Sequence, residues 1–272
     1  MLVEQHIKNN INPYYCVSHY EGDLDWMDQY PKCGYVIYSK GAVKPNKSNV
    51  KILPNVGYNL SSYLDFIISN YENLPEITVF CKNNIFERHV KEDRFKELVT
   101  RCVFTPLEDN RFWSRLSFPI SVISNDGGYL EFNNNWFATK YKNKYFANYS
   151  AFYKLIFDTD VIPSYLRFSP GANYLVPKEN ILLRSKNFYV NLNTFISHDQ
   201  LSCESHFLER SLVAIWNSNL KESDVMTSIL SQEQLDTLIQ LASANESKPT
   251  FIRRYAHRKI IQFFNNILGS SS

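Results

Sequence analysis

Several features that mark special classes of protein are scarce in this chain of 272 residues. Glycine occurs only 8 times, which argues against Gly-rich repeats and an extended β-solenoid, and no repeat at a fixed period is visible. No apolar run reaches the roughly 18 residues needed to span a bilayer, and the N-terminal stretch lacks the apolar core of a signal peptide. The 29 Lys and Arg and 27 Asp and Glu give a net charge of +2, too balanced to indicate a nucleic-acid partner.

Cysteine is also sparse and irregularly placed. The 5 cysteines are widely scattered and form no C-x-x-C pair, so we expect neither a zinc site nor a disulfide framework. Three of them lie in or beside apolar strand-like runs, where cysteine is usually a small buried hydrophobic residue. This usage predicts a reducing, cytoplasmic location.

The remaining composition is that of a protein with a large core, because 44% of the residues are hydrophobic and 15% aromatic. The first third of the chain alternates apolar strands with helical connections. We expect strands over 14–20, 35–39, 50–54 and 77–81, a short helix over 24–30 and an amphipathic helix from Ser61 or Ser62 to Tyr71. This order predicts an α/β fold with a mainly parallel or mixed central sheet flanked by helices.

The second half is predicted to be richer in helix. We expect helices over 95–104, 178–196, 203–216 and 231–243, a strand over 172–176, and a turn at Gly127-Gly128. No linker divides the chain, so we expect one domain over 1–247 followed by a basic amphipathic helix or tail over 248–272. Such a tail suits an anionic membrane surface, which would place the protein at the inner face of a membrane, or it packs on the domain with its basic face in solvent.

Polar residues follow each of the predicted parallel strands. In parallel sheets, ligands bind outside the carboxyl ends of the strands. We therefore expect residues 19–23, 39–40, 55–59 and 82–84 to meet along one rim of the sheet.

Three stretches carry a resemblance to a known family: "NVGYNLSSYLDFIISNYENLPEITVFCKNN", "RFSPGANYLVPKENILLRSKNFYVNL" and "HFLERSLVAIW". Together they resemble a domain family of unknown function from fungi and bacteria, over roughly Cys16 to Trp216. That family is itself similar to GT-A type glycosyltransferases. The resemblance implies a single-domain, Rossmann-like GT-A fold that moves a sugar from a nucleotide-sugar donor to a glycan or lipid-linked acceptor.

The resemblance also has a clear departure. GT-A enzymes carry a D-x-D motif that holds Mn²⁺ or Mg²⁺ on the donor diphosphate, and this chain has Lys82-Asn83-Asn84 at that position. Asparagine oxygens without carboxylate charge hold such hard cations weakly, whereas Lys82 could neutralise the diphosphate directly. Candidate metal ligands are Asn84 and the literal D-x-D pair Asp158 and Asp160, which would equally well cap the segment that follows.

For the donor nucleotide, the candidates combine the strand tips with the N-x-G turn and one helical arginine. An acidic side chain after the first strand can accept hydrogen bonds from ribose hydroxyls, although such a composition is also that of an ordinary turn. Arg88 and His89 are further phosphate candidates, or else the start of an exposed helix. The predicted donor residues are His19, Tyr20, Glu21, Asp23, Ser39, Asn55, Gly57, Asn59, Lys82, Asn83, Asn84 and Arg210.

The resemblance places the chemistry on the helix over 203–216. It implies that Glu209 is the general base of an inverting transfer, and the i, i+3 spacing puts His206 on the same face. Glu204 is the alternative base, and a solvated helix face with local ion pairs is the alternative to any catalytic role. The SPGA loop is implied to line the acceptor side through Ser169, Pro170, Gly171 and Ala172.

Two other functions remain open at this point. A catalytically degenerate protein of the same fold would bind a glycan or nucleotide without turnover, and the missing D-x-D favours it. A nucleic-acid-binding module working through the basic tail is the third reading, which the balanced charge disfavours.

Overall fold

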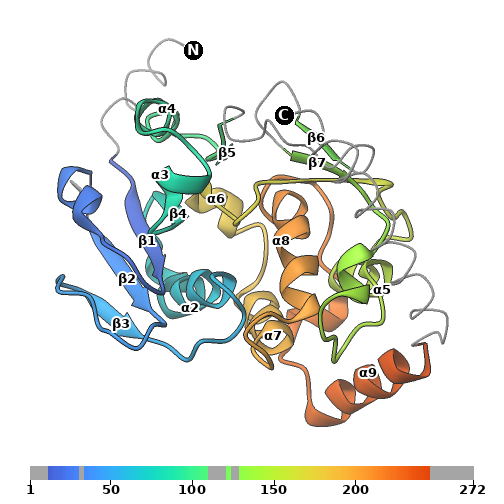
Figure 1. Ribbon diagram of the computed structural model, residues 1–272. Helices are drawn as coiled ribbons and strands as arrows, with labels where there is room; N and C mark the ends of the chain where they lie inside the picture. The colour runs from blue at the N-terminus through green and yellow to red at the C-terminus, as the bar shows by residue number, and fades with distance from the viewer. Residues whose placement is uncertain (1–11, 31–33, 110–120, 124–128, 246–272) are drawn as a thin grey trace, which may run out of the picture.

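A computed structural model describes residues 12–30, 34–109, 121–123 and 129–245. A central six-stranded sheet with the strand order β3-β2-β1-β4-β9-β5 forms the middle layer of an α/β fold (Figure 1). Its strands are β1 (Tyr14–His19), β2 (Tyr35–Ser39), β3 (Val50–Ile52), β4 (Ile77–Lys82), β5 (Thr105–Pro106) and β9 (Tyr174–Pro177). The first four pair in parallel, whereas β9 runs antiparallel to both β4 and β5, so the sheet is mixed.

Both faces of the sheet are buried along β1, β2, β4 and β9, which explains the nearly continuous apolar runs of these strands, whereas the edge strand β3 is largely exposed. Cys16, Tyr38 and Phe80 face one hydrophobic cluster, which includes α2 (Leu60–Asn70), α7 (Lys186–Ile196) and α8 (Cys203–Trp216). The alternate residues face a second cluster, formed with the 3-10 helix η2 (Asp25–Gln29), α3 (Ile85–Arg88) and α4 (Glu92–Leu98). Adjacent strand residues therefore point into different cores.

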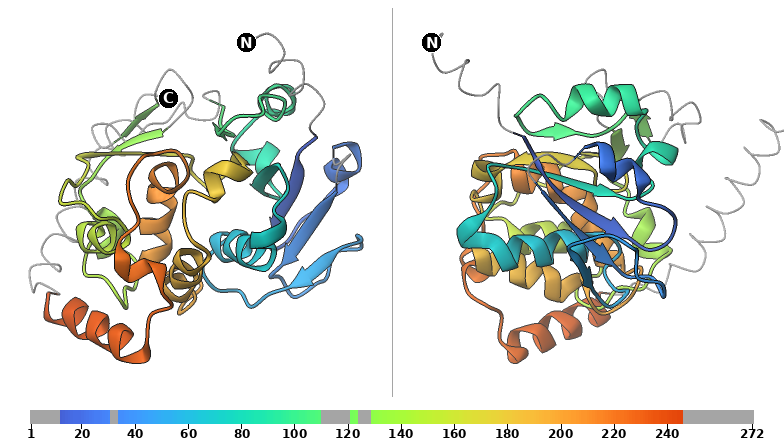
Figure 2. Two further views of the ribbon diagram at one scale, coloured as in Figure 1. Left: turned by 180° about the vertical axis from the view of Figure 1, so that it is seen from behind. Right: turned by 90° about the vertical axis from the view of Figure 1, so that its left-hand side faces the viewer.

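A smaller antiparallel sheet lies against α8 on the side away from the central sheet. It consists of β6 (Ser121–Ile123), β7 (Tyr129–Phe132) and β8 (Tyr165–Phe168). The remaining elements are η3 (Tyr71–Asn73), η5 (Trp136–Thr139), α5 (Tyr149–Ile156), α6 (Lys178–Ile181), η6 (Asp224–Thr227) and α9 (Gln232–Ala244). Helix α9 is far from the central sheet, beyond α7 and α5 (Figure 2).

The predicted α/β class, the four parallel strands and helices α2, α8 and α9 are confirmed. The single helix expected over 178–196 is wrong, because the chain breaks it into α6 and α7. Ser185 ends the break by capping α7, since its hydroxyl accepts the N–H of Phe188 at 3.2 Å. The helix expected over 95–104 begins earlier and ends at Leu98.

Two predicted features, the turn at Gly127-Gly128 and the tail over 248–272, lie outside the described residues. Within the described part of the chain, no helix is both long and apolar enough to cross a membrane.

The topology of the central sheet contains a switch point. From β1 the chain continues to its neighbour β2 and then to β3, whereas from β4 it leads, through α3 and α4, to β5 at the opposite edge. The connections thus diverge between the adjacent strands β1 and β4. In open α/β sheets this switch point leaves a crevice at the carboxyl ends of the two strands.

Candidate functional site

A cavity of about 250 Å³ opens at the switch point, and we call it the strand-tip cavity. Its walls come from the carboxyl ends of β1, β2 and β4, the turn before α2, the helix α3 and one residue of the loop after α7. The lining residues are Ser18, Tyr20, Glu21, Lys40, Asn55, Tyr58, Asn59, Lys82, Asn83, Asn84, Arg88 and Gln200.

The turn over 54–59 is held in an unusual backbone conformation. Gly57 and Tyr58 both have positive φ angles, 63° and 55°, a region that suits glycine and is uncommon for tyrosine. The loop after α7 supports them, since Gly57 N–H donates to Asp199 O at 2.9 Å and Tyr58 N–H to Gln200 O at 3.0 Å. This turn brings Tyr58 and Asn59 into the cavity wall.

Lys40 lies under the same turn and is only 8% exposed. Its ammonium donates to Val56 O at 2.7 Å and also to Tyr58 O and Ser61 Oγ. Burial lowers the pKa of Lys40 to about 7, because desolvation disfavours the charged form. An ammonium has three N–H donors, which matches the three oxygens around it.

Lys82 extends from the end of β4 across the cavity to Tyr58. Its Nζ donates to Tyr58 Oη at 2.9 Å and lies 4.3 Å from the centre of the Tyr58 ring. The backbone N–H of Lys82 is held by Asn173 Oδ1 at 3.1 Å. Together with the exposed Arg88 and the buried Lys40, it gives the cavity three cationic side chains.

The two asparagines after Lys82 have different roles. Asn83 fixes the strand tip, because its side chain donates to Glu21 O at 2.7 Å and its carbonyl accepts the indole N–H of Trp26 at 2.8 Å. Asn84 stands at the N-cap of the short helix α3 without a side-chain cap hydrogen bond. Its amide is therefore not engaged in holding that helix.

The donor groups of this cavity do not fit a dedicated divalent-cation site. Glu21 is the one carboxylate among the described residues of the lining, which also include Lys40, Lys82 and Arg88. Mn²⁺ and Mg²⁺ are bound in proteins mainly through carboxylate oxygens. Among the residues that the structure describes, no group of three or more His, Cys, Asp and Glu is arranged to hold a metal.

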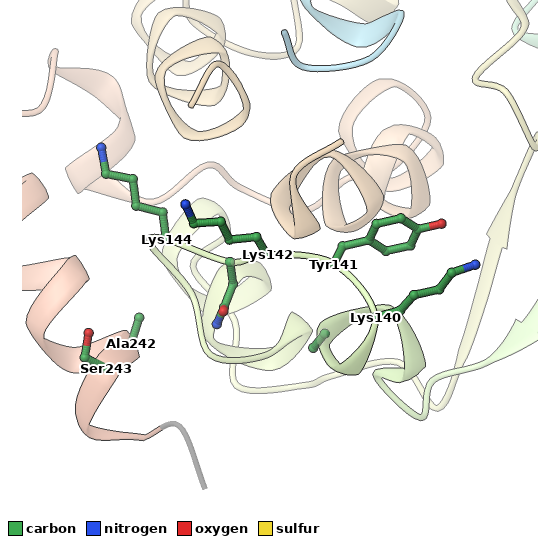
Figure 3. A pocket seen from close by; sticks show the side chains of 8 residues that line it. Lys140, Tyr141, Lys142, Lys144, Ala242 and Ser243 are labelled. Carbon is green, nitrogen blue, oxygen red and sulfur yellow. The ribbon is translucent and has the colours of Figure 1, made fainter. Parts of the chain in front are cut away.

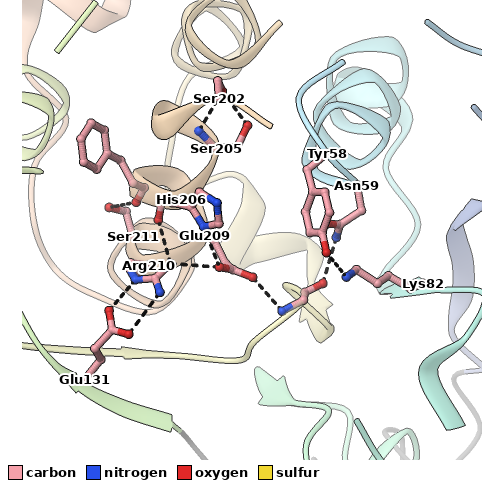
Figure 4. Close-up of polar contacts among 12 residues, drawn as sticks. Tyr58, Asn59, Lys82, Glu131, Ser202, Ser205, His206, Glu209, Arg210 and Ser211 are labelled. Carbon is pink, nitrogen blue, oxygen red and sulfur yellow. Dashed lines mark hydrogen bonds and ion pairs between the residues drawn. The ribbon is translucent and has the colours of Figure 1, made fainter. Parts of the chain in front are cut away.

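The SPGA loop links the strand-tip cavity to helix α8 through one residue. Asn59 Nδ2 donates to Gly171 O at 2.9 Å, and Gly171 N–H donates to Glu209 Oε1 at 2.7 Å. Figure 4 shows Asn59 and Glu209 on opposite sides of this link. Gly171 has φ 80°, and a Cβ at this position would lie 2.7 Å from His89 Cε1, so both the backbone and the space require glycine.

Glu209 is held on its other side by Arg210. Arg210 Nη1 donates to Glu209 Oε2 at 3.1 Å, and the same guanidinium binds both carboxylate oxygens of Glu131 at 2.7 and 3.2 Å. The rings of Phe137 and Phe168 lie 4.6 and 4.5 Å from the guanidinium carbon. Arg210 thus sits in a buried ion pair and does not line the strand-tip cavity.

His206 shares a face of α8 with Glu209, as the spacing predicted. Its Nδ1 lies 3.9 Å from Glu209 Oε2, and its ring stacks on Tyr141 with 4.1 Å between centroids. Burial lowers the pKa of His206 to about 4, against the opposing effect of Glu209. The imidazole is therefore neutral at neutral pH.

The structure brings most of the predicted donor residues together. Those that line the strand-tip cavity are Tyr20, Glu21, Asn55, Asn59, Lys82, Asn83 and Asn84. His19 and Ser39 are buried beneath it, with His19 Nδ1 3.4 Å from Ser39 Oγ. Asp23 instead accepts the N–H of Asp25 at the start of η2, at 3.3 Å, and Gly57 acts through the backbone of its turn.

The other predicted residues are placed apart from the cavity. Ser169 and Ala172 are fully buried, so they shape the SPGA loop. Asp158 and Asp160 are exposed, and Asp160 pairs with Lys154 at 2.8 Å. Glu204, the alternative base, is also fully buried.

Glu204 has a structural set of contacts. Its Oε1 accepts the backbone N–H groups of Lys144 and Tyr145, both at 2.7 Å, and its Oε2 lies 2.9 Å from His198 Nε2. These contacts anchor the loop before α5 to the start of α8.

That loop forms one wall of a second cavity, of about 420 Å³ (Figure 3). The other wall is α9, through Ala242 and Ser243. The described residues of the lining include three lysines and no carboxylate, and they are Ala138, Lys140, Tyr141, Lys142, Asn143, Lys144, Ala242 and Ser243. In Figure 3, Tyr141 and Lys140 point away from α9. None of the predicted site residues lines this cavity.

The sequence places Lys40 and Tyr58 within the predicted rim segments but does not indicate what they do there, and it does not single out Ser18 or Gln200. Lys40 directly follows β2, and nothing in the sequence pattern signals that it is buried. Tyr58 directly follows the N-x-G residues, and its conformation depends on the loop after α7. Gln200 comes from that loop, more than a hundred residues along the chain, and no local signal identifies it.

Residues 16–232 match a family described as a protein of unknown function (DUF3431). The chain belongs to the DUF3431 family. The DUF3431 match runs from β1 to the start of α9, so it includes the whole lining of the strand-tip cavity and Glu209. No curated protein and no solved structure matches the chain. The likeness to a family of unknown function is thereby confirmed, and the further likeness to GT-A enzymes stays a prediction.

Proposed function

We propose that this protein is a GT-A-like glycosyltransferase that moves a sugar from a nucleotide-sugar donor to a glycan or lipid-linked acceptor. The observation that carries the proposal is the strand-tip cavity, in which Lys82 and Arg88 meet side-chain amides at the switch point between β1 and β4. Nucleotides bind at this place in α/β sheets. Ammonium and guanidinium groups are the side chains that bind phosphate most strongly.

Four residues of the strand-tip cavity have proposed donor roles that their positions support. Lys82 and Arg88 would balance the charge that develops on the diphosphate as it leaves. Glu21 would accept hydrogen bonds from ribose hydroxyls, and Tyr20, which is 52% exposed at the edge of the cavity, offers a ring face to the base. Because the residues at the D-x-D position do not suit a divalent ion, no step in this scheme uses a metal.

Glu209 is the proposed general base, which takes the proton from the acceptor hydroxyl in an inverting transfer. The Gly171 N–H and Arg210 fix the direction of its carboxylate, and Gly171 links it to Asn59 in the donor cavity. We therefore assign Arg210 to positioning Glu209, rather than to phosphate.

The acceptor would approach from the side of His206 and Tyr141. Tyr141 stacks on His206 and is half-buried, as is Trp136, whose ring centroid lies 6.3 Å from that of His206. Aromatic faces of this kind suit sugar rings. Pro170 and Gly171 of the SPGA loop would complete this side, with Ser169 and Ala172 holding the loop from within.

The test of the base is Glu209→Gln, assayed by nucleoside diphosphate release with a panel of nucleotide sugars and glycan acceptors. We expect a fall in kcat of roughly 10²–10⁴-fold with the donor Kd unchanged. The matched control is Glu179→Gln, at an exposed glutamate in the first turn of α6. Unchanged turnover in a folded Glu209→Gln variant would remove Glu209 from this role.

A second candidate is a binding protein of the same fold that holds a nucleotide or glycan without turnover. Two observations favour it: both Glu209 oxygens already have partners, and Lys82-Asn83-Asn84 replaces the acidic motif. Saturable donor binding without nucleoside diphosphate release, across all acceptors tried with and without Mn²⁺, would select this candidate.

A further inference from the structure

The least expected residue of the strand-tip cavity is Lys40. It is the buried one among the lysines and arginine that the structure describes in the lining, and among the described residues its ammonium pairs with neutral oxygens rather than with a carboxylate. Its hydrogen-bond acceptors are two backbone carbonyls, of Val56 and Tyr58, and the hydroxyl of Ser61. A buried ammonium that is paired only with neutral oxygens loses hydration without gaining a counter-charge.

The position of Lys40 connects it to the ligand in two ways. It lines the cavity, so an anion bound there would act on its charge directly. It also supports the turn that carries Asn55, Tyr58 and Asn59 into the cavity wall. A neutral amine has two N–H donors for the three surrounding oxygens, so losing the proton weakens the hold on this turn.

We infer that Lys40 is a proton-linked anion-binding residue, whose ammonium form is completed by the phosphate groups of the ligand. A bound anion places a negative charge beside Lys40. Anion binding therefore favours protonation of Lys40, and protonation of Lys40 favours anion binding. The inference deepens the proposed function and rests on its donor cavity, but it requires only that the cavity binds a phosphorylated or similar anion.

In the ligand-free protein, burial lowers the pKa of Lys40 to about 7. The ammonium form and the neutral amine are therefore both populated near neutral pH. A bound anion raises this pKa, which means that the ligand binds the protonated form better. Affinity is then highest at acid pH and falls as the pH rises through 7. If the ligand raises the pKa by about two units, the affinity falls roughly tenfold between about pH 6 and pH 8.

Other titratable and charged groups lie in the cavity lining or on the elements that pack around Lys40, and their effects on binding must be separated from its own. His19 and Glu21 belong to the tip of β1, and Asp65 of α2 lies one turn beyond Ser61. The remaining groups are Tyr20, Tyr58, Lys82 and Arg88. Because these neighbours include an imidazole as well as carboxyl and phenol groups, substitutions at Lys40 itself decide whether Lys40 carries the pH dependence.

The experiment is isothermal titration calorimetry in pairs of buffers that differ in ionisation enthalpy. Nucleotide sugars are the first probe, because their diphosphate has no titrating group near neutral pH, and sulfate is the second for the same reason. We expect uptake of about 0.8 proton per ligand at about pH 8 and about 0.1 at about pH 6.

Three variants make the result specific. Lys40→Arg keeps a charge that does not titrate in this range, and we expect it to bind without proton uptake and without pH dependence. Lys40→Met removes the charge, and we expect weaker binding that is also independent of pH. Lys82→Gln should bind more weakly but keep the proton uptake, since Lys40 is intact. Circular dichroism checks that each variant is folded.

The inference is overturned if the wild-type protein binds without proton uptake, or if Lys40→Arg or Lys40→Met takes up as many protons as the wild type. It is also overturned if neither nucleotide sugars nor sulfate bind at millimolar concentration. Proton-linked binding without any sugar transfer would leave it standing and would count against the proposed catalytic function alone.

Discussion

The buried pair between Arg210 and Glu131 gives the most direct prediction about stability. Both side chains are nearly inaccessible, at 4% and 6%, and two charged hydrogen bonds of 2.7 and 3.2 Å join them. Removing one member of such a pair leaves the other charge buried without a partner. We therefore expect Arg210→Met to lower the free energy of unfolding by about 3–5 kcal/mol.

The corresponding double variant separates lost pairing from lost packing. Replacing both residues, as Glu131→Leu with Arg210→Met, removes both buried charges, and we expect it to recover most of the lost stability. The free energy of unfolding is measured by urea unfolding followed by circular dichroism. In a thermal melt, each kcal/mol of lost stability lowers Tm by about 2–4 °C. Lys140→Met is the control, since Lys140 is exposed. An Arg210→Met variant within about 1 kcal/mol of the wild type would refute the reasoning.

Three further predictions test the surroundings of the site. Gly171→Ala combines a positive φ with a contact at 2.7 Å to His89, so we expect a cost of at least about 1–3 kcal/mol in urea unfolding; a cost below about 0.5 would contradict this. Glu204→Gln removes a buried carboxylate that accepts two backbone N–H groups and pairs with His198, so we expect a loss of about 2–4 kcal/mol with turnover per folded molecule unchanged. Finally, we expect EDTA to change the rate of sugar transfer by no more than about twofold, because no carboxylate cluster occurs among the described residues of the strand-tip cavity; a loss of activity that Mn²⁺ restores would show a metal requirement.

The rim of the site could be predicted from sequence because it depends on local patterns and one topological rule. The apolar runs of β1, β2 and β4 are unambiguous, and parallel strands place their carboxyl ends together. The polar residues that follow these strands, such as Tyr20 and Lys82, were therefore located correctly without knowledge of any contact.

The interior of the site could not be predicted because it depends on pairings between distant segments. Glu131 and Arg210 are 79 residues apart in the sequence, so no local pattern pairs them. Without that pairing, the positive charge of Arg210 suggests phosphate as its partner. The buried state of Lys40 depends on the turn over 54–59, which the loop after α7 holds in place. The break between α6 and α7 is hard to predict because residues 178–196 contain no glycine or proline to mark it, and its one local signal is the N-cap residue Ser185.

One assay tests most directly whether the strand-tip cavity binds a nucleotide-sugar donor and whether Glu209 acts as the base. Purified protein is incubated with a panel of nucleotide sugars and of glycan and lipid-linked acceptors, and the release of nucleoside diphosphate is followed for the wild type, Lys82→Gln and Glu209→Gln. We predict release by the wild type with at least one donor, a raised donor KM for Lys82→Gln, and a fall in kcat for Glu209→Gln. Absence of both donor binding and release by the folded wild-type protein, over the whole panel, would contradict the account.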